Sequence, residues 1–169
     1  MSRGEDQSIE VRRLTDATLW GRPVCRYQTA LARMQTLVAR PKTEGDVLLV
    51  VEHPPTITLG RRGRRENIHN TTLMLPGREP VEVAVHEIAR GGDVTYHAPG
   101  QLVVYPIVQL PRWTGEPDRF PHGDLRAFVR GLEGAMLRTC RKFGLSAMRR
   151  DGFAGLWISE TRKIASIGV

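Results

Sequence analysis

The chain has 169 residues, a formal net charge of +7 at pH 7, 40% hydrophobic residues and 6% aromatic residues. This length fits one domain with a sizeable core, and the composition is that of a globular protein rather than a disordered one. No apolar run approaches the roughly 20 residues that a membrane-spanning helix needs, and the acidic N-terminus does not have the pattern of a signal peptide. Cys25 and Cys140 give neither a disulfide framework nor a metal-binding spacing, so we expect a cytoplasmic protein without a metal site.

Before residue 60 the sequence predicts a strand at 9–14, a helix at 24–40, a buried strand at 47–52 and a short strand at 56–59. The helix is predicted from the three-four spacing of its apolar residues, and Pro41 ends it. The strand at 47–52 is a continuous apolar run, and the prolines that follow it, Pro54 and Pro55, end it because they restrict the backbone and lack an N–H donor. Residues 1–8 are expected to form a flexible tail.

Residues 60–65 read GRRGRR and form what we call the arginine loop. One interpretation is a basic loop that is simply solvated. The other is an anion clamp beside a substrate pocket, because guanidinium groups recognise carboxylates and phosphates. The loop is not a phosphate-binding P-loop, since the lysine and the Ser/Thr of that motif are absent.

A glycine-rich segment between two predicted strands carries the densest chemistry in the chain. Residues 90–101 read RGGDVTYHAPGQ and lie between an alternating strand at 81–88 and another strand at 102–108. Adjacent glycines let a backbone turn sharply and approach a ligand closely. Because a cation, hydroxyls and an imidazole occur beside them, we interpret this signature segment as one wall of a substrate pocket. His86 falls on the polar side of its strand, which predicts a surface position.

The clearest helix lies at 124–143, where apolar residues keep the spacing of one buried face. Gly144 suits its C-terminal end, and Cys140 on the apolar stripe is expected to be a buried core thiol rather than a nucleophile. Around this helix the sequence predicts loops at 69–80 and 111–123 and short strands at 147–150, 152–158 and 163–169. Few helices among many short strands favour an α+β fold with a mostly antiparallel sheet.

Four segments resemble, in order and in spacing, the octanoyltransferases of protein lipoylation. They are VEHPPTITLGRRG at 51–63, RGGDVTYHAPGQ at 90–101, DGFAGLWI at 151–158 and KIASIGV at 163–169. This lipoyl(octanoyl) transferase family shares its fold with biotin and lipoate protein ligases. The resemblance therefore implies, for residues 9–169, an α+β catalytic domain with a mixed, largely antiparallel sheet and flanking helices.

The same resemblance implies an activity and its partners. An octanoyl group would pass from acyl carrier protein to a lysine of lipoyl domains, which belong to 2-oxoacid dehydrogenases and to the H protein of glycine cleavage. Acyl carrier proteins are acidic, so the net charge of +7 suits such a donor. The implied enzyme is a monomer that uses no cofactor and binds neither nucleic acid nor a membrane.

Site residues are carried over from the family motif by motif. The family's chemistry passes through a cysteine thioester that the acceptor lysine then attacks. A nearby lysine lowers the pKa of that cysteine, and this motif maps onto Lys163. The acyl pocket maps onto Ser166, Ile167 and Gly168 and onto the signature residues Arg90, Gly91, Gly92, Asp93, Val94, Thr95, Tyr96 and His97. For His97 a purely structural role is the alternative.

The sequence departs from the family pattern in two places. Ala98 stands where the family usually has glycine, which predicts a shifted turn. The family's cysteine lies in a Pro-Cys-Gly motif after the lysine motif, and this sequence ends at Val169 before such a motif. We therefore expect a catalytic domain that is incomplete at its C-terminus and that carries the helper lysine without its nucleophile. The alternatives are a second polypeptide that supplies the missing part, an inactive homologue that binds acyl chains or carrier protein, and a basic nucleic-acid-binding module with steep salt dependence.

Overall fold

The structure is a computed structural model, and it describes residues 9–41, 43–114 and 122–169. The predicted tail at residues 1–8 lies outside these ranges. The chain divides into two compact units, residues 1–108 and 109–169. Within the described ranges, no helix is long and apolar enough to cross a membrane.

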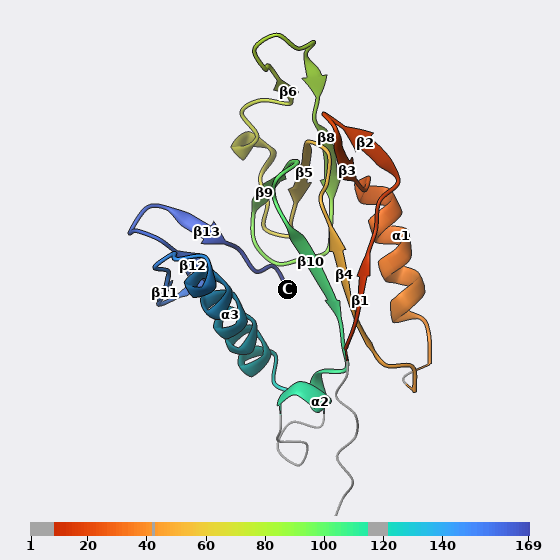
Figure 1. Ribbon diagram of the computed structural model, residues 1–169, viewed down its shortest axis with the longest axis vertical. Coiled ribbons are helices and arrows are strands. Elements are labelled where there is room, and N and C mark those ends of the chain that lie inside the picture. The colour runs from red at the N-terminus through yellow and green to blue at the C-terminus, as the bar shows by residue number, and fades with distance from the viewer. Residues whose placement is uncertain (1–8, 42, 115–121) are drawn as a thin grey trace, which may run out of the picture. The chain divides into compact units, whose positions relative to one another are not determined.

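The first unit is built on a sheet whose central strand is β4 (Asp46–Val51). This strand pairs in parallel with β1 (Ile9–Arg13) and antiparallel with β10 (Val103–Ile107). Helix α1 (Tyr27–Val38) packs on the sheet (Figure 1). The continuous apolar run that predicted a buried strand is thus the centre of the unit.

Alternate residues of β4 form the core beneath α1. Val47, Leu49 and Val51 are at most 1% exposed, and they pack with Ala30 and Leu37 of α1. Burying an aliphatic side chain of this size stabilises a fold by about 1.5–3 kcal/mol. The core therefore fixes the position of β4, whose C-terminal end leads into the candidate site.

The helix begins at Tyr27, three residues later than predicted, because the preceding residues form a hairpin. Strands β2 (Ala17–Leu19) and β3 (Arg22–Val24) pair antiparallel. The turn residues Trp20 and Gly21 have φ angles of 52° and 76°, which suits the tight turn that joins two such strands. This hairpin was not predicted from the sequence.

A second sheet in the same unit is centred on β5 (Thr56–Leu59), all of whose residues are buried. Strand β5 pairs in parallel with β8 (Ala84–Glu87) and antiparallel with β9 (Val94–His97). Strand β9 is the central part of the signature segment. The sheet therefore anchors that segment against a fully buried strand.

The single strand predicted at 81–88 is wrong, because the chain changes partner within it. Strand β7 (Val81–Glu82) pairs with β6 (Thr72–Leu73), which lies inside the stretch predicted to be a loop. The N–H of Val83 then donates to the carbonyl of Thr71 at 2.7 Å, and β8 continues along β5. Apolar and polar residues alternate in the same way before and after Val83, so the sequence gives no sign of this break.

The second unit contains α2 (Leu110–Thr114), α3 (Leu125–Lys142) and an antiparallel sheet of β11 (Met148–Arg150), β12 (Phe153–Trp157) and β13 (Lys163–Ala165). Helix α2 takes up the beginning of the predicted loop at 111–123, and residues 115–121 of that loop lie outside the described ranges. Mixed sheets, with mostly antiparallel pairs and few helices, confirm the predicted α+β class.

Helix α3 has the predicted ends but not the predicted buried face. The Asp124 carboxylate accepts N–H groups of the first turn at 2.8 and 3.0 Å, and Gly144 ends the helix with a φ of 70°. On the apolar stripe, however, Leu125 is 45% exposed, and Cys140 is half-buried rather than a core thiol. The helix residue that is buried is a charged one, Glu133.

Candidate functional site

The signature segment lies against the arginine loop. The N–H of Gly60 donates to the carbonyl of Asp93 at 2.9 Å, and the N–H of Arg61 donates to the carbonyl of Arg90 at 3.0 Å. A Cβ at Gly60 would lie only 2.6 Å from the carbonyl oxygen of Gly92. Glycine is therefore required for this approach, and the two segments form one structural element.

The carboxylate of Asp93 holds the rest of the arginine loop in place. Its Oδ1 accepts the backbone N–H of Arg64 at 3.1 Å, and its Oδ2 accepts from the amide nitrogen of Asn67 at 2.5 Å. Asn67 belongs to a short 3-10 helix, η1 (Arg65–Asn67), that follows the loop. These contacts fix the path of the loop backbone from Arg64 to Asn67 relative to the signature segment.

Arg90 is turned inward. Its guanidinium donates to the carbonyl and the hydroxyl of Thr58 at 2.8 and 2.9 Å, and to the carbonyl of Gly91 at 2.9 Å. Thr58 is fully buried on β5. Burial lowers the pKa of Arg90 from its usual value, but a guanidinium remains charged in proteins. This cation therefore braces the signature segment against β5.

The arginines of the arginine loop itself are exposed and form a basic face. Arg65 pairs with Glu87 at 2.6 Å. Among the described residues, no acidic side chain pairs with the exposed arginines Arg61, Arg62 and Arg64. A hollow of about 400 Å³ next to Leu59 is lined by Arg61 and by the Arg65–Glu87 pair. Three unpaired guanidinium groups on one fixed loop can bind a polyanionic partner.

Beneath the signature segment lies a cluster of aromatic rings. His53 follows β4 and is 0% exposed, and its ring lies 5.6 Å from Tyr27 and 5.6 Å from His97, centroid to centroid. Tyr27 in turn stacks on His86 at 4.9 Å and an interplanar angle of 25°. His86, predicted to lie at the surface, is half-buried, because Tyr27 of α1 packs on its ring.

The hydrogen bonds of His53 define its tautomer. Its Nδ1 lies 2.7 Å from the carbonyl oxygen of Cys25, which can only accept, so Nδ1 carries the hydrogen. Its Nε2 then accepts from the hydroxyl of Tyr105 at 2.9 Å. Burial raises the pKa of Tyr105, so this hydroxyl keeps its hydrogen. His53 is a neutral, fully bonded residue that joins β10, the start of α1 and His97.

We expect the first unit to lose stability as the pH falls from 7 to 5. Burial lowers the pKa values of His53 and His97, whereas both titrate near 6.5 in an unfolded chain. Below that value the unfolded state binds more protons, so stability falls by at most about 1.4 kcal/mol per pH unit for each proton. Urea unfolding followed through amide NMR signals of β4 measures the slope.

The controls for this pH dependence are two histidine variants. His53→Gln removes one buried titrating group, and its stability is expected to vary less with pH although it is lower throughout. The exposed His69→Gln is expected to keep the slope of the parent chain. An unchanged slope in His53→Gln would show that His53 does not carry the acid sensitivity.

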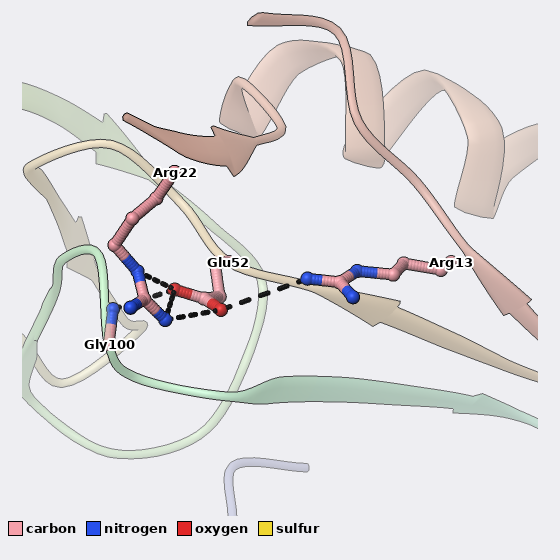
Figure 2. A network of polar contacts seen from close by, with 4 residues as sticks. All are labelled: Arg13, Arg22, Glu52 and Gly100. Carbon is pink, nitrogen blue, oxygen red and sulfur yellow. Dashed lines mark hydrogen bonds and ion pairs between the residues drawn. The ribbon is translucent and has the colours of Figure 1, made fainter. Parts of the chain in front are cut away.

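Glu52 is a second residue that organises the signature segment (Figure 2). Its carboxylate receives the guanidinium of Arg22 at 2.9 Å, lies 3.9 Å from that of Arg13 and accepts the backbone N–H of Gly100 at 2.7 Å. The Gly100 amide and then Arg22 lower the pKa of Glu52. One carboxylate thus ties β1 and β3 to the turn that follows His97.

His97 itself is bonded within that turn. Its Nδ1 lies 2.5 Å from the side-chain oxygen of Gln101, whose amide nitrogen donates to the carbonyl of Tyr96 at 3.2 Å. The oxygen can only accept, so His97 carries its hydrogen on Nδ1 and leaves Nε2 as an acceptor. Tyr96, in contrast, is 42% exposed.

The second unit places the predicted lysine motif on β13. Lys163 is exposed, and its Nζ lies 5.3 Å from the centroid of the Trp157 ring on the paired strand β12. Ser166, Ile167 and Gly168 follow β13 outside regular structure. Within the described parts of the chain, no three His, Cys, Asp or Glu side chains are grouped so that they could hold a metal ion.

The two cysteines differ in environment. Cys25 is 0% exposed, and its thiol lies 3.6 Å from the carbonyl of Arg26. Burial raises the pKa of this thiol, which disfavours the nucleophilic thiolate. Cys140 is half-buried on α3. The geometry of Cys25 is that of a core residue.

Comparison with known proteins identifies the class to which this geometry belongs. A solved structure of a T. acidophilum protein proposed to be a lipoate protein ligase superposes with a TM-score of 0.51 at 14% identity, covering 90% of this chain and 60% of that one. That likeness shows the fold. Residues 26–169 match the family described as the lipoyl protein ligase A/B catalytic domain, and the chain belongs to this family.

Curated relatives carry a more specific name. Octanoyltransferases from Chloroflexus aggregans and Nitratidesulfovibrio vulgaris are 43% and 47% identical over 146 and 144 residues, or 83% and 85% of this chain. One from Acidobacterium capsulatum is 44% identical over 130 residues, or 74% of this chain. These findings confirm the resemblance drawn from the four motifs. The chain spans 61%, 61% and 51% of the length of these three relatives.

Proposed function

We propose that the protein containing this chain is a cytoplasmic octanoyltransferase. It takes octanoyl from acyl carrier protein and transfers it to a lysine of a lipoyl domain, in 2-oxoacid dehydrogenases or in the H protein of glycine cleavage. The name of its relatives supports this activity. The structural observation that carries the donor assignment is the exposed basic face of Arg61, Arg62 and Arg64, which is hydrogen-bonded to the proposed acyl-pocket wall.

The proposed reaction has two acyl transfers. A cysteine thiolate attacks the carbonyl carbon of the octanoyl thioester, and the carrier leaves as a thiol after taking a proton. The amine of the acceptor lysine then attacks the new thioester, an amide forms, the amine loses a proton and the cysteine leaves as a thiolate. Lys163 is the cation that stabilises this thiolate, both before it attacks the octanoyl thioester and when it leaves in the second transfer.

We place the reacting cysteine in the part of the family that this chain does not span. Cys25 does not suit the role, because it is buried and its pKa is raised. The residues proposed to contact the acyl chain are Gly91 and Gly92 in the first unit, and Ser166, Ile167 and Gly168 in the second unit. Arg90 and Asp93 shape that wall through their contacts with β5 and the arginine loop.

Reversing two charges on the basic face tests the donor assignment. Arg61→Glu/Arg62→Glu is expected to weaken binding of octanoyl-acyl carrier protein by about tenfold or more, because each reversal replaces an attraction with a repulsion. The loss should shrink as salt is added, since exposed charges are screened within about 10 Å at 0.1 M. Fluorescence anisotropy with labelled carrier protein measures the dissociation constant.

Arg126→Glu/Arg138→Glu is the matched control. Both arginines are exposed on α3, so the change in net charge is the same. Equal weakening by both double variants would refute a docking role for the arginine loop. Donor binding that depends on the loop, without transfer by a chain extended to the length of its relatives, would identify an inactive carrier-binding homologue.

A further inference from the structure

Lys163 is held on a surface made by its neighbouring strand. Its Cα is paired with that of Trp157, and its Cε passes so close to Gly155 that a Cβ there would lie 2.8 Å away. Its Nζ ends 5.3 Å from the centroid of the Trp157 ring. The lysine side chain therefore crosses a bare peptide and reaches an indole, where a cation is attracted by the ring.

The indole is itself fixed by its neighbours. The guanidinium of Arg150 lies 5.1 Å from the Trp157 ring centroid, and the ring of Phe153 meets it nearly edge-on at 6.1 Å and 75°. Trp157 is therefore held by a cation and by a ring from its own hairpin. A fixed indole restricts the positions that the ammonium of Lys163 can adopt.

Gly155 has the backbone conformation that this crossing requires. Its φ is 110°, a conformation that side-chain-bearing residues rarely adopt, and a Cβ would lie 2.2 Å from the carbonyl oxygen of Ala165. Its N–H donates to Oε1 of Glu133 at 3.1 Å. The peptide beneath Lys163 is thus anchored to helix α3 by one buried carboxylate.

Both carboxylate oxygens of Glu133 accept hydrogen bonds. It is 2% exposed, and its Oε2 accepts from the guanidinium groups of Arg149 at 3.0 Å and Arg130 at 3.3 Å. A buried charge network is costly to desolvate and is often no more stabilising than well-packed apolar residues. The geometry that Glu133 imposes on Gly155 is the better physical reason for a carboxylate at this position.

We infer that Glu133 is a positioning residue for Lys163, acting through Gly155, with Trp157 as the ring that receives the ammonium. The helix carboxylate holds the Gly155 peptide in place, the lack of a side chain there leaves a path for Lys163, and that path leads to the indole. The functional meaning of this arrangement rests on the proposed role of Lys163 in acyl transfer. The arrangement itself can be measured without substrate.

The chain suits a direct test because it contains three lysines, Lys42, Lys142 and Lys163. Reductive methylation with ¹³C-formaldehyde labels each amine and keeps its charge. The methyl signal of Lys163 is expected upfield of that of the exposed Lys142, because of the ring current of Trp157. Trp157→Leu is expected to remove the upfield displacement and thereby assigns it to the indole.

Glu133→Leu tests the positioning role. The signal of Lys163 is expected to move to the position of that of Lys142, while Trp157 is still present. Glu133→Gln keeps an oxygen that can accept the Gly155 N–H, so it should retain most of the displacement. A full displacement in Glu133→Leu would overturn the inference, and so would an equal loss in both variants.

Two further measurements separate a positioning role from a general loss of structure. Dispersed amide signals of α3 and β12 show whether each variant is folded, and if Glu133→Leu is not, Arg149→Met tests the same anchor by removing one partner of Glu133. In a chain extended to the length of its relatives, Glu133→Leu should lower kcat by roughly 10- to 100-fold with little change in KM. An intact ring-current shift without any transfer activity would reject the proposed function and leave the positioning role standing.

Discussion

Replacing Lys163 with alanine is expected to lower octanoyl transfer by about 100-fold or more, in a chain extended to the length of its relatives. The ammonium stabilises the thiolate of the reacting cysteine, and an ordinary thiol with a pKa of roughly 8.5 is mostly protonated at pH 7. The rate of the variant should therefore recover partly as the pH rises toward 9. Mass spectrometry of the octanoylated lipoyl domain measures the rate at each pH.

Lys142→Ala is the matched control for this experiment. Lys142 is also exposed and lies in the last turn of α3, so its loss changes the net charge equally. Its rate and pH profile are expected to equal those of the parent. A Lys163→Ala enzyme with the parent rate would mean that another group activates the cysteine.

Replacing Gly155 with alanine is expected to destabilise the second unit by roughly 3 kcal/mol. The new Cβ would lie 2.2 Å from the carbonyl oxygen of Ala165 and 2.8 Å from Cε of Lys163. The φ of 110° adds backbone strain for any residue with a side chain. Each effect costs about 1–3 kcal/mol. Urea unfolding followed by amide NMR signals of β12 and α3 measures the change.

Gly131→Ala provides a control in the same unit. Gly131 lies inside α3, and a Cβ there would meet no atom within 4 Å. Alanine is favoured over glycine in a helix interior by roughly 0.5–1 kcal/mol, so this variant is expected to be more stable than the parent. If Gly155→Ala were as stable as Gly131→Ala, the close approach of Ala165 and Lys163 of β13 to Gly155 of β12 would not exist in solution.

Local patterns predicted the elements whose contacts lie close in sequence. The limits of α3 could be predicted because its capping residue Asp124 and its terminal Gly144 act on adjacent turns. The strands β4 and β5 were predicted from uninterrupted apolar or alternating runs. For the same reason, the glycine-rich signature segment could be identified as a place of close backbone approach, and it does contact the arginine loop at Gly60.

Interactions between distant residues could not be predicted in this way. His53 lies 28 residues from Cys25 and 52 residues from Tyr105, so only the fold brings its two partners to the imidazole. The break at Val83 has the same origin, because its N–H donates to Thr71 instead of a sheet partner. The ring that half-buries His86 belongs to α1, which alternation along β8 cannot reveal.

One missed residue did leave a signal in the sequence. Glu133 lies four residues after Val129, three before Met136 and seven before Cys140, so it falls on the apolar stripe of α3. A carboxylate on such a stripe must be paired with cations when it is buried. Of the arginines that pair with it, Arg130 lies one helical turn before it on α3, and Arg149 lies on β11, after the loop that follows the helix.

The parallel pairing of β1 with β4 has a consequence for the protein's resistance to aggregation. Residues 9–13 precede the region that matches the family, and they cover one side of the apolar strand DVLLVV. Without them, the five apolar residues from Val47 to Val51 would present free N–H and C=O groups at a sheet edge, which is a template for aggregation. With β1 in place, the edge is IEVRR, whose charges discourage pairing with another chain. Recombinant forms that begin at residue 26 would therefore lose their protection against self-association.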